Sequence, residues 1–271
     1  MESLPFEFIQ KVVTQLPRIS SFILCNLTSK WSPEAEKRIT RQTKWLTITS
    51  APNGLFYKVL IFPSYPPEYA SLDNWDLKGD ELEEVNICHS IVNLKETNGN
   101  RVIDEKSVNA LLIIFQHSRY GISRLTFTDR WRAHEALLNQ LLQGIRYART
   151  IDVDMTLTET SILPRPTFSL YCKTPIPACF EQNILDTLQS LKAFFLQFTE
   201  DQDDFYKKVL ELIAKRANKE GQLKCLQIDG SYADMADGLG LNWTLYKHPR
   251  REFAPYSSGC LFFEMGNCRV T

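Results

Sequence analysis

The first 45 residues follow a spacing of apolar positions that predicts three short helices. Apolar residues at 9, 12, 13 and 16 share one helical face, and Pro17 ends this first helix. A second helix is expected over 22–29. A third begins at Ser32, where a capping hydroxyl precedes a proline and an acid, and extends to about Gln42. Because so small a bundle buries little apolar surface, we expect it to pack on another protein or on the rest of the chain.

After Trp45 the pattern changes to the two-residue alternation of strands. Leu46–Thr49 alternates apolar and polar residues, and Phe56–Phe62 predicts a second, more deeply buried strand. The stretch from 68 to 84 contains seven acidic residues and one lysine. This charge density predicts a solvated loop.

Helices and strands then alternate through the rest of the chain. Apolar spacing predicts helices near 107–118, 131–147, 179–190 and 203–219, each followed by a short strand. Beyond Leu241 the helical pattern stops. The segments 243–246 and 259–264 are expected to form a closing hairpin or cap.

Four of these strands share one template, in which two apolar residues flank a polar one and Thr or Asp follows. They begin at Leu125, Ile151, Leu196 and Leu226, at intervals of 26, 45 and 30 residues, and Leu46–Thr49 also fits. The longest interval has room for an additional strand, 168–172. One strand and one helix every 25–30 residues is typical of leucine-rich repeats, although their Asn or Cys ladder is missing here.

We therefore predict an α/β fold with a helical module at 1–45 and a degenerate leucine-rich-repeat-like α/β solenoid at 46–271. An ordinary α/β sheet of parallel strands is the alternative. In the solenoid, the apolar template positions should be buried: Leu125, Phe127, Ile151, Val153, Leu196, Phe198, Leu226 and Ile228. The polar positions between them should share one exposed face that binds a partner: Thr126, Asp152, Gln197 and Gln227.

Composition and charge reduce the number of function classes. The chain has 31 basic and 32 acidic side chains and a net charge of −1, so no nucleic-acid or membrane ligand is expected. The longest apolar run, Ala110–Phe115, is far shorter than a membrane-spanning helix. The amino terminus lacks the pattern of a signal peptide, and seven cysteines without a repeated short spacing indicate reduced thiols. We expect a cytoplasmic or nuclear protein.

Motifs for catalysis, metals and cofactors are each incomplete. His134 and Glu135 begin like a zinc-protease helix, but Leu138 occupies the position of the second histidine. Gly238 begins like a dinucleotide-binding loop, yet Trp243 occupies the position of the third glycine. Cysteines and histidines have no zinc spacing. The sequence therefore predicts no enzyme activity, no metal and no cofactor.

One basic segment is a candidate anchor for a substrate. The stretch 246–251 combines an aromatic ring with two guanidinium groups in Tyr246, Arg250 and Arg251. Aromatic and arginine side chains are enriched at interface hot spots, and paired arginines suit an acidic or phosphorylated peptide. A solvated closing loop is the alternative interpretation of this segment.

The order of residues in the helical start resembles the F-box motif. The chain matches it without a gap from residue 4 to residue 31: Leu4, Pro5, Glu7, Ile9, Val12, Val13, Leu16, Pro17, Leu24, Leu27 and Trp31. The rest of the chain resembles the divergent F-box families expanded in nematodes. An ordinary helical hairpin packed on its own domain is the alternative.

The resemblance implies a binding module rather than a catalyst. In F-box proteins this module docks on a Skp-type adaptor, which links to a cullin and a RING protein that loads ubiquitin. The adaptor-binding residues would be Leu4, Pro5, Ile9, Val12, Val13, Leu16, Pro17, Leu24, Leu27 and Trp31. The repeat domain would present an unidentified protein substrate. A repeat-type interaction scaffold without ubiquitin transfer is the second hypothesis, and an enzyme of unrecognised type is the third.

Overall fold

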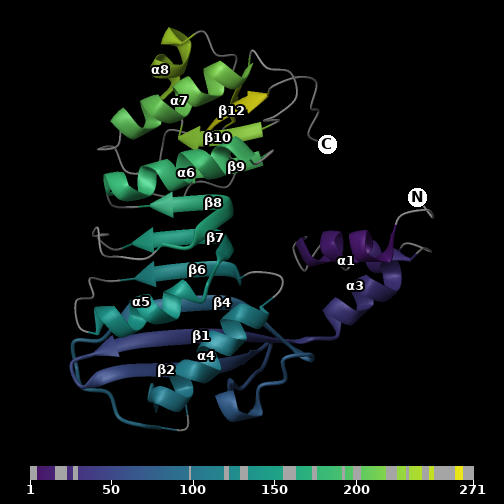
Figure 1. The fold of residues 1–271 in the computed structure, drawn as a ribbon, viewed down its shortest axis with the longest axis vertical. Helices are drawn as coiled ribbons and strands as arrows, with labels where there is room; N and C mark the ends of the chain where they lie inside the picture. Colours follow the sequence, from purple (N-terminus) through teal and green to yellow (C-terminus); the bar gives the residue numbers. More distant parts are fainter. Residues whose placement is uncertain are drawn as a thin grey trace. The chain divides into compact units, whose positions relative to one another are not determined.

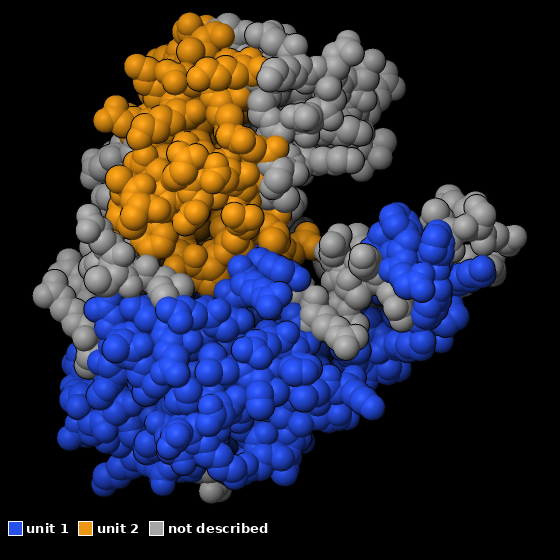
Figure 2. All heavy atoms as spheres, in the orientation of Figure 1, with its two compact units in different colours: residues 1–148 blue, residues 149–271 orange. Residues whose placement is uncertain are grey.

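A computed structural model gives the fold. It describes residues 5–15, 23–26, 30–97, 99–118, 122–128, 134–154, 163–172, 176–190, 193–197, 203–217, 225–229, 232–239, 244–246 and 260–264. The chain forms two compact units, residues 1–148 and residues 149–271, which Figure 2 colours separately. We call them unit 1 and unit 2 and describe each by itself.

Unit 1 begins with a helical segment and continues as a sheet with helical crossovers (Figure 1). Its helices are α1 (Phe6–Gln15), α3 (Trp31–Ile39), the 3-10 turn η1 (Leu72–Asn74), α4 (Glu105–His117) and α5 (Glu135–Gln143). Its strands are β1 (Gln42–Ala51), β2 (Gly54–Phe62), β3 (Glu68–Ala70), β4 (Asp80–His89), β5 (Arg101–Val102) and β6 (Ile122–Thr128).

The strand order in unit 1 is β6-β4-β1-β2-β3, with β5 also paired to β2. β1 and β2 form an antiparallel hairpin, and Gly54 supplies the positive φ of 144° that its turn requires. β1, β4 and β6 are parallel neighbours. Parallel neighbours need a crossover connection, and α4 provides it between β4 and β6.

Unit 2 continues the alternation of strand and helix. Its elements are β7 (Tyr147–Asp154, which begins at the end of unit 1), β8 (Arg165–Cys172), α6 (Ala178–Ser190), β9 (Ala193–Gln197), α7 (Asp203–Ala217), β10 (Cys225–Asp229), α8 (Ala233–Gly238), β11 (Thr244–Tyr246) and β12 (Cys260–Glu264). Their order is β11-β12-β10-β9-β8-β7. β8, β9 and β10 run parallel, and β12 lies antiparallel to β10 and β11.

The core of unit 1 lies between one face of its sheet and the crossover helices. Alternate residues of β1, β4 and β6 are buried, among them Leu46, Val85 and Leu125, and α4 buries Leu111 and Ile114. Successive strand residues point to opposite faces, so the positions between these lie on the second face. That second face is half-buried, for example at Thr47, Asn86 and Thr126.

The predicted mixture of helices and strands is confirmed, and so are several details. The four predicted helices correspond to α4, α5, α6 and α7, the extra strand to β8, and the closing hairpin to β11 and β12. Of the apolar template positions, the following are buried: Leu125, Phe127, Ile151, Val153 and Leu196. Phe198 lies outside the described residues, as do the side chains of Leu226 and Ile228.

The solvated loop predicted over 68–84 is wrong. That stretch contains β3, η1 and the first half of β4, and Glu81 and Leu82 are buried there. The charge density predicted a loop because every acid was expected in water. Two of these acids instead form buried ion pairs, Asp80 with Lys44 and Glu81 with Arg38. A paired carboxylate can be buried, whereas an isolated one belongs in water.

The architecture is a mixed, mostly parallel α/β sheet. In each unit an antiparallel pairing ends the run of parallel strands, β1 with β2 in unit 1 and β10 with β12 in unit 2, whereas the predicted leucine-rich-repeat solenoid would consist of parallel strands. In the helical start, α1 and α3 correspond to the first and third predicted helices. Between them the structure describes only residues 23–25 as helical, and α3 ends at Ile39, before Gln42.

Candidate functional site

The helical start has one face turned into the chain and another turned to solvent. α1 packs against α3, and its residues Ile9 and Val13 are buried by this chain itself. Phe8, which lies off that helical stripe, is 47% exposed, and Ile23 is 67% exposed. The structure therefore separates residues that hold the helices together from residues that are free to meet a partner.

The predicted adaptor-binding residues fall on both sides of this division. Pro5 is exposed, Val12, Leu24 and Trp31 are half-buried, and Ile9 and Val13 are buried within the chain. Leu4, Leu16, Pro17 and Leu27 lie outside the described residues. The predicted adaptor-binding set did not include Phe6, Phe8 and Ile23, which the structure exposes. The sequence could have indicated these three residues, because each is apolar but lies at the end of the buried apolar face of its helix or outside that face.

A buried arginine joins the helical start to the sheet. Arg38 of α3 donates from Nη1 to the carbonyl oxygen of Val13 in α1, and from Nη2 and Nε to Oε1 of Glu81 in β4, at 3.2 and 3.4 Å. Arg38 is 3% exposed and Glu81 is 6% exposed. A planar guanidinium can satisfy several acceptors at once, so one side chain links α1, α3 and β4. We call Arg38 and Glu81 the anchor pair.

A second buried ion pair lies at the same end of β1 and β4. Lys44 Nζ forms an ion pair with Oδ2 of Asp80, and it also lies 4.7 Å from the ring centroid of Trp75. Oδ2 of Asp80 accepts a further hydrogen bond, 2.7 Å long, from the backbone N–H of Asp76. The lysine charge is thus balanced by a carboxylate and an aromatic face, which allows both side chains to be buried.

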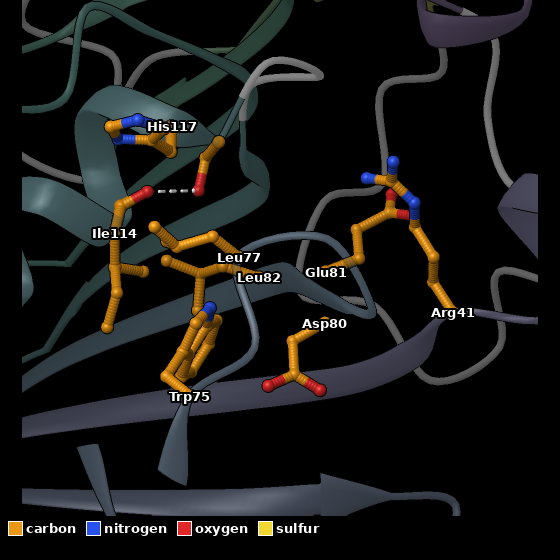
Figure 3. Close-up of a pocket in the computed structure, with 9 residues that line it drawn as sticks. Arg41, Trp75, Leu77, Asp80, Glu81, Leu82, Ile114 and His117 are labelled. Carbon is orange, nitrogen blue, oxygen red and sulfur yellow. Dashed lines mark hydrogen bonds between the residues drawn. The ribbon is translucent and has the colours of Figure 1, made fainter. Parts of the chain in front are cut away.

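A small cavity lies between this end of β4 and the last turn of α4 (Figure 3). Its volume is about 20 Å³, and Arg41, Glu81 and His117 are among its lining residues. Oε2 of Glu81 is buried and has no hydrogen-bond partner among the described atoms. Ser118 Oγ donates to the carbonyl oxygen of Ile114 at 2.8 Å, the bond drawn in Figure 3. The volume suits about one water molecule, whereas substrate pockets are typically several hundred Å³.

The second candidate surface is the face of the unit 1 sheet opposite α4, which we call the open face. The predicted substrate residue Thr126 lies here, half-buried and opposite Asn86 of β4 in the register. On β1 the same face carries Thr47 and Thr49, and the Thr49 Oγ1 is 3.2 Å from Sγ of Cys88. The centre of the open face is therefore lined by small polar side chains.

The other predicted substrate residues belong to unit 2. Asp152 of β7 is half-buried. The register places Gln197 of β9 opposite Tyr171 and Gln227 of β10 opposite Phe195, so the two glutamines are not partners in the sheet. Tyr246 is the last residue of β11. Arg250 and Arg251 lie outside the described residues.

The described residues were also compared with the requirements of a metal site, a disulfide bond and a membrane-spanning helix. Within the described ranges, no group of three or more His, Cys, Asp or Glu side chains is placed to hold a metal ion. Cys25, Cys88, Cys172 and Cys179 are free thiols. No helix in the part of the chain that the structure describes is long and apolar enough to span a bilayer.

Comparison of the chain with protein-family models, with curated proteins and with solved structures gave no match.

Proposed function

We propose that this protein is an F-box substrate receptor, which docks on a Skp-type adaptor of a cullin–RING ubiquitin ligase through its helical start. The observation that carries the proposal is the order of Leu-Pro, paired aliphatic, Leu-Pro and Trp residues between 4 and 31, together with exposed apolar side chains on the same segment. Exposed apolar groups gathered on a short segment are typical of interaction sites.

The geometry of unit 1 supports this proposal. Arg38 holds the helical start against the sheet through two buried acceptors, so a protein bound to α1 would have a defined relation to β4. The open face would then present the substrate. The chain itself would perform no chemistry.

The test is binding of a purified Skp-type adaptor to the full chain. A carboxylate at Phe8 or Ile23 would have to be desolvated in the interface, which is costly for an unpaired charge. We expect Phe8→Asp with Ile23→Asp to abolish co-precipitation of the adaptor. Both side chains are exposed, so the thermal transition of this variant should stay close to that of wild type.

Tyr147→Asp is the matched control, because Tyr147 is an exposed aromatic residue outside the helical start. It should bind the adaptor as wild type does. Full adaptor binding by the double variant would contradict the proposed docking face. Failure of the wild-type chain to bind any Skp-type adaptor would contradict the F-box proposal itself.

A second candidate function is an interaction scaffold without ubiquitin transfer. The open face of unit 1 favours it, since a partner-binding sheet does not require a ligase. Recovery of the cullin with the adaptor, and ubiquitin transfer to a bound protein in a reconstituted ligase, would support the receptor. Adaptor binding without recovery of the cullin would support the scaffold.

A further inference from the structure

One edge of the open face gathers aromatic side chains around a lysine. In the register, Leu60 of β2 lies opposite Trp45 of β1 on one side and opposite Tyr69 of β3 on the other. Cross-strand partners point to the same face, and so do residues two positions apart on one strand. Trp45, Tyr69, Lys58 and Phe62 therefore share the face of Leu60. We call these five residues the aromatic edge.

The rings of the aromatic edge are held in place. The Trp45 and Phe62 rings stack at a centroid distance of 4.3 Å and an interplanar angle of 12°. Lys58 Nζ lies 4.8 Å from the centroid of the Tyr69 ring. Gly99 approaches the same ring so closely that a Cβ there would be 3.0 Å from a ring carbon. Rings fixed in advance lose little conformational entropy when a partner binds.

These ordered rings remain accessible. Phe62 and Tyr69 are each 43% exposed. Large aromatic side chains are enriched at the energetic centres of protein interfaces. Ordered and accessible aromatic rings at the edge of a half-buried sheet face are therefore suited to binding a protein segment.

Charge indicates the chemistry of that segment. Among the described residues, no carboxylate forms an ion pair with Lys58, and the nearby Glu68 alternates to the opposite face of β3. The next acid on the open face, Glu84, lies beyond Trp45 and has Arg124 opposite it in the register. The aromatic edge itself thus offers a cation without an acid, and a ligand with a carboxylate would complement it.

We propose that the aromatic edge binds an extended, proline-containing segment of a partner protein that carries a carboxylate beside the proline. Proline rings dock on flat aromatic surfaces, and a polyproline helix is already extended, so ordering it costs little entropy. The carboxylate pairs with Lys58. The inference rests on the proposed function, in which this segment belongs to the ubiquitination substrate.

The experiment measures fluorescence anisotropy of labelled peptides with the full-length protein. The probes are Pro-Pro-Glu-Pro-Pro, its lysine counterpart Pro-Pro-Lys-Pro-Pro and the flexible Gly-Ser-Glu-Gly-Ser. We expect the glutamate peptide to bind about tenfold more tightly than either of the other two. Lys58→Glu should reverse the preference between the glutamate and lysine peptides.

Phe62→Ala should weaken the glutamate peptide about tenfold through loss of an aromatic contact, whereas the control Tyr147→Ala should leave it unchanged. Equal affinity for the glutamate and lysine peptides would overturn the inference. No saturable binding of any peptide would also overturn it, as would binding that is insensitive to Phe62→Ala.

Adaptor binding is measured on the same preparations, so that the two proposals fail separately. Loss of peptide binding with retained adaptor binding removes only the aromatic edge as a recognition site. Peptide binding without adaptor binding supports the aromatic edge and contradicts the receptor function.

Discussion

Gly79 lies where the chain turns into β4. A Cβ at this position would be 2.5 Å from Oδ2 of Asp76, a contact that requires something to move. The Asp76 carboxylate is not free to move without loss, because it accepts a hydrogen bond from the backbone N–H of Lys78 at 2.9 Å. Hydrogen bonds from the backbone N–H groups of Lys78 and Gly79 also lower the pKa of Asp76. The turn therefore requires a residue without a side chain at position 79.

The prediction at this position is that Gly79→Ala lowers the melting temperature. The added methyl group displaces the Asp76 carboxylate from its backbone donors. The carbonyl oxygen of Gly79 also accepts a hydrogen bond from the backbone N–H of Gln42 in β1, so a shift of the turn would disturb this bond as well. Gly238→Ala is the matched control, since a Cβ at Gly238 meets nothing within 4 Å. Thermal unfolding followed by circular dichroism should show a decrease only for Gly79→Ala. Equal transitions for the two variants would mean that the turn accommodates a side chain.

At the scale of the element, α4 shows how local chemistry fixes a helix end. Asp104 is its N-cap, and Oδ1 accepts hydrogen bonds from the backbone N–H and the hydroxyl of Ser107 at 2.8 and 2.7 Å. The hydroxyl bond, followed by the backbone bond, lowers the pKa of Asp104. The ionised carboxylate therefore stabilises the folded state above the ordinary aspartate pKa, and this contribution disappears as the pH falls through the lowered value.

We expect Asp104→Ala to lower the melting temperature by a constant amount between pH 7 and about 5, and to lower it progressively less as the pH falls below about 5 through the lowered pKa of Asp104. Asn109→Ala, on the exposed side of the same helix, should cause a shift that does not vary with pH. Melting curves at a series of pH values measure both. A shift for Asp104→Ala that stays constant as the pH falls below about 5 would contradict the charged cap.

At the scale of the whole molecule, the anchor pair connects the helical start to the sheet of unit 1. Arg38 and Glu81 are separated by 43 positions and are both buried, so the arginine charge compensates the carboxylate of Glu81 for its lost hydration. Oε2 of Glu81 has no partner among the described atoms, which makes the acid especially dependent on the arginine. Removal of one partner leaves an uncompensated buried charge.

Arg38→Met should therefore reduce the free energy of unfolding by about 3–5 kcal/mol, whereas Arg38→Met with Glu81→Leu should lose much less. Urea denaturation of the wild type, both single variants and the double variant gives the coupling between the two residues. Lys106→Met is a control for an exposed ion pair, with Asp73, and should have a small effect. Additive losses in the double variant would show that the anchor pair is not coupled.

The sequence by itself determined the features that depend on local periodicity. Apolar residues at helical spacing predicted α4, α5, α6 and α7, and the repeated template predicted the buried positions of β6 and β7, such as Leu125 and Val153. These predictions succeed because period and burial are coupled within a single element. The F-box resemblance also comes from sequence alone, and adaptor binding is the measurement that tests it.

The tertiary structure decided which residues are turned inward and which charges are compensated. Val13 and Phe8 are both apolar residues of α1, yet only packing against α3 makes one buried and the other exposed. The sequence predicted solvated acids at positions 80 and 81, whereas the fold places Lys44 and Arg38, which are distant in the chain, beside them. The aromatic edge likewise requires the pairing of three strands. Pairing between distant segments has no periodic signature in one sequence, because it depends on the register that folding selects.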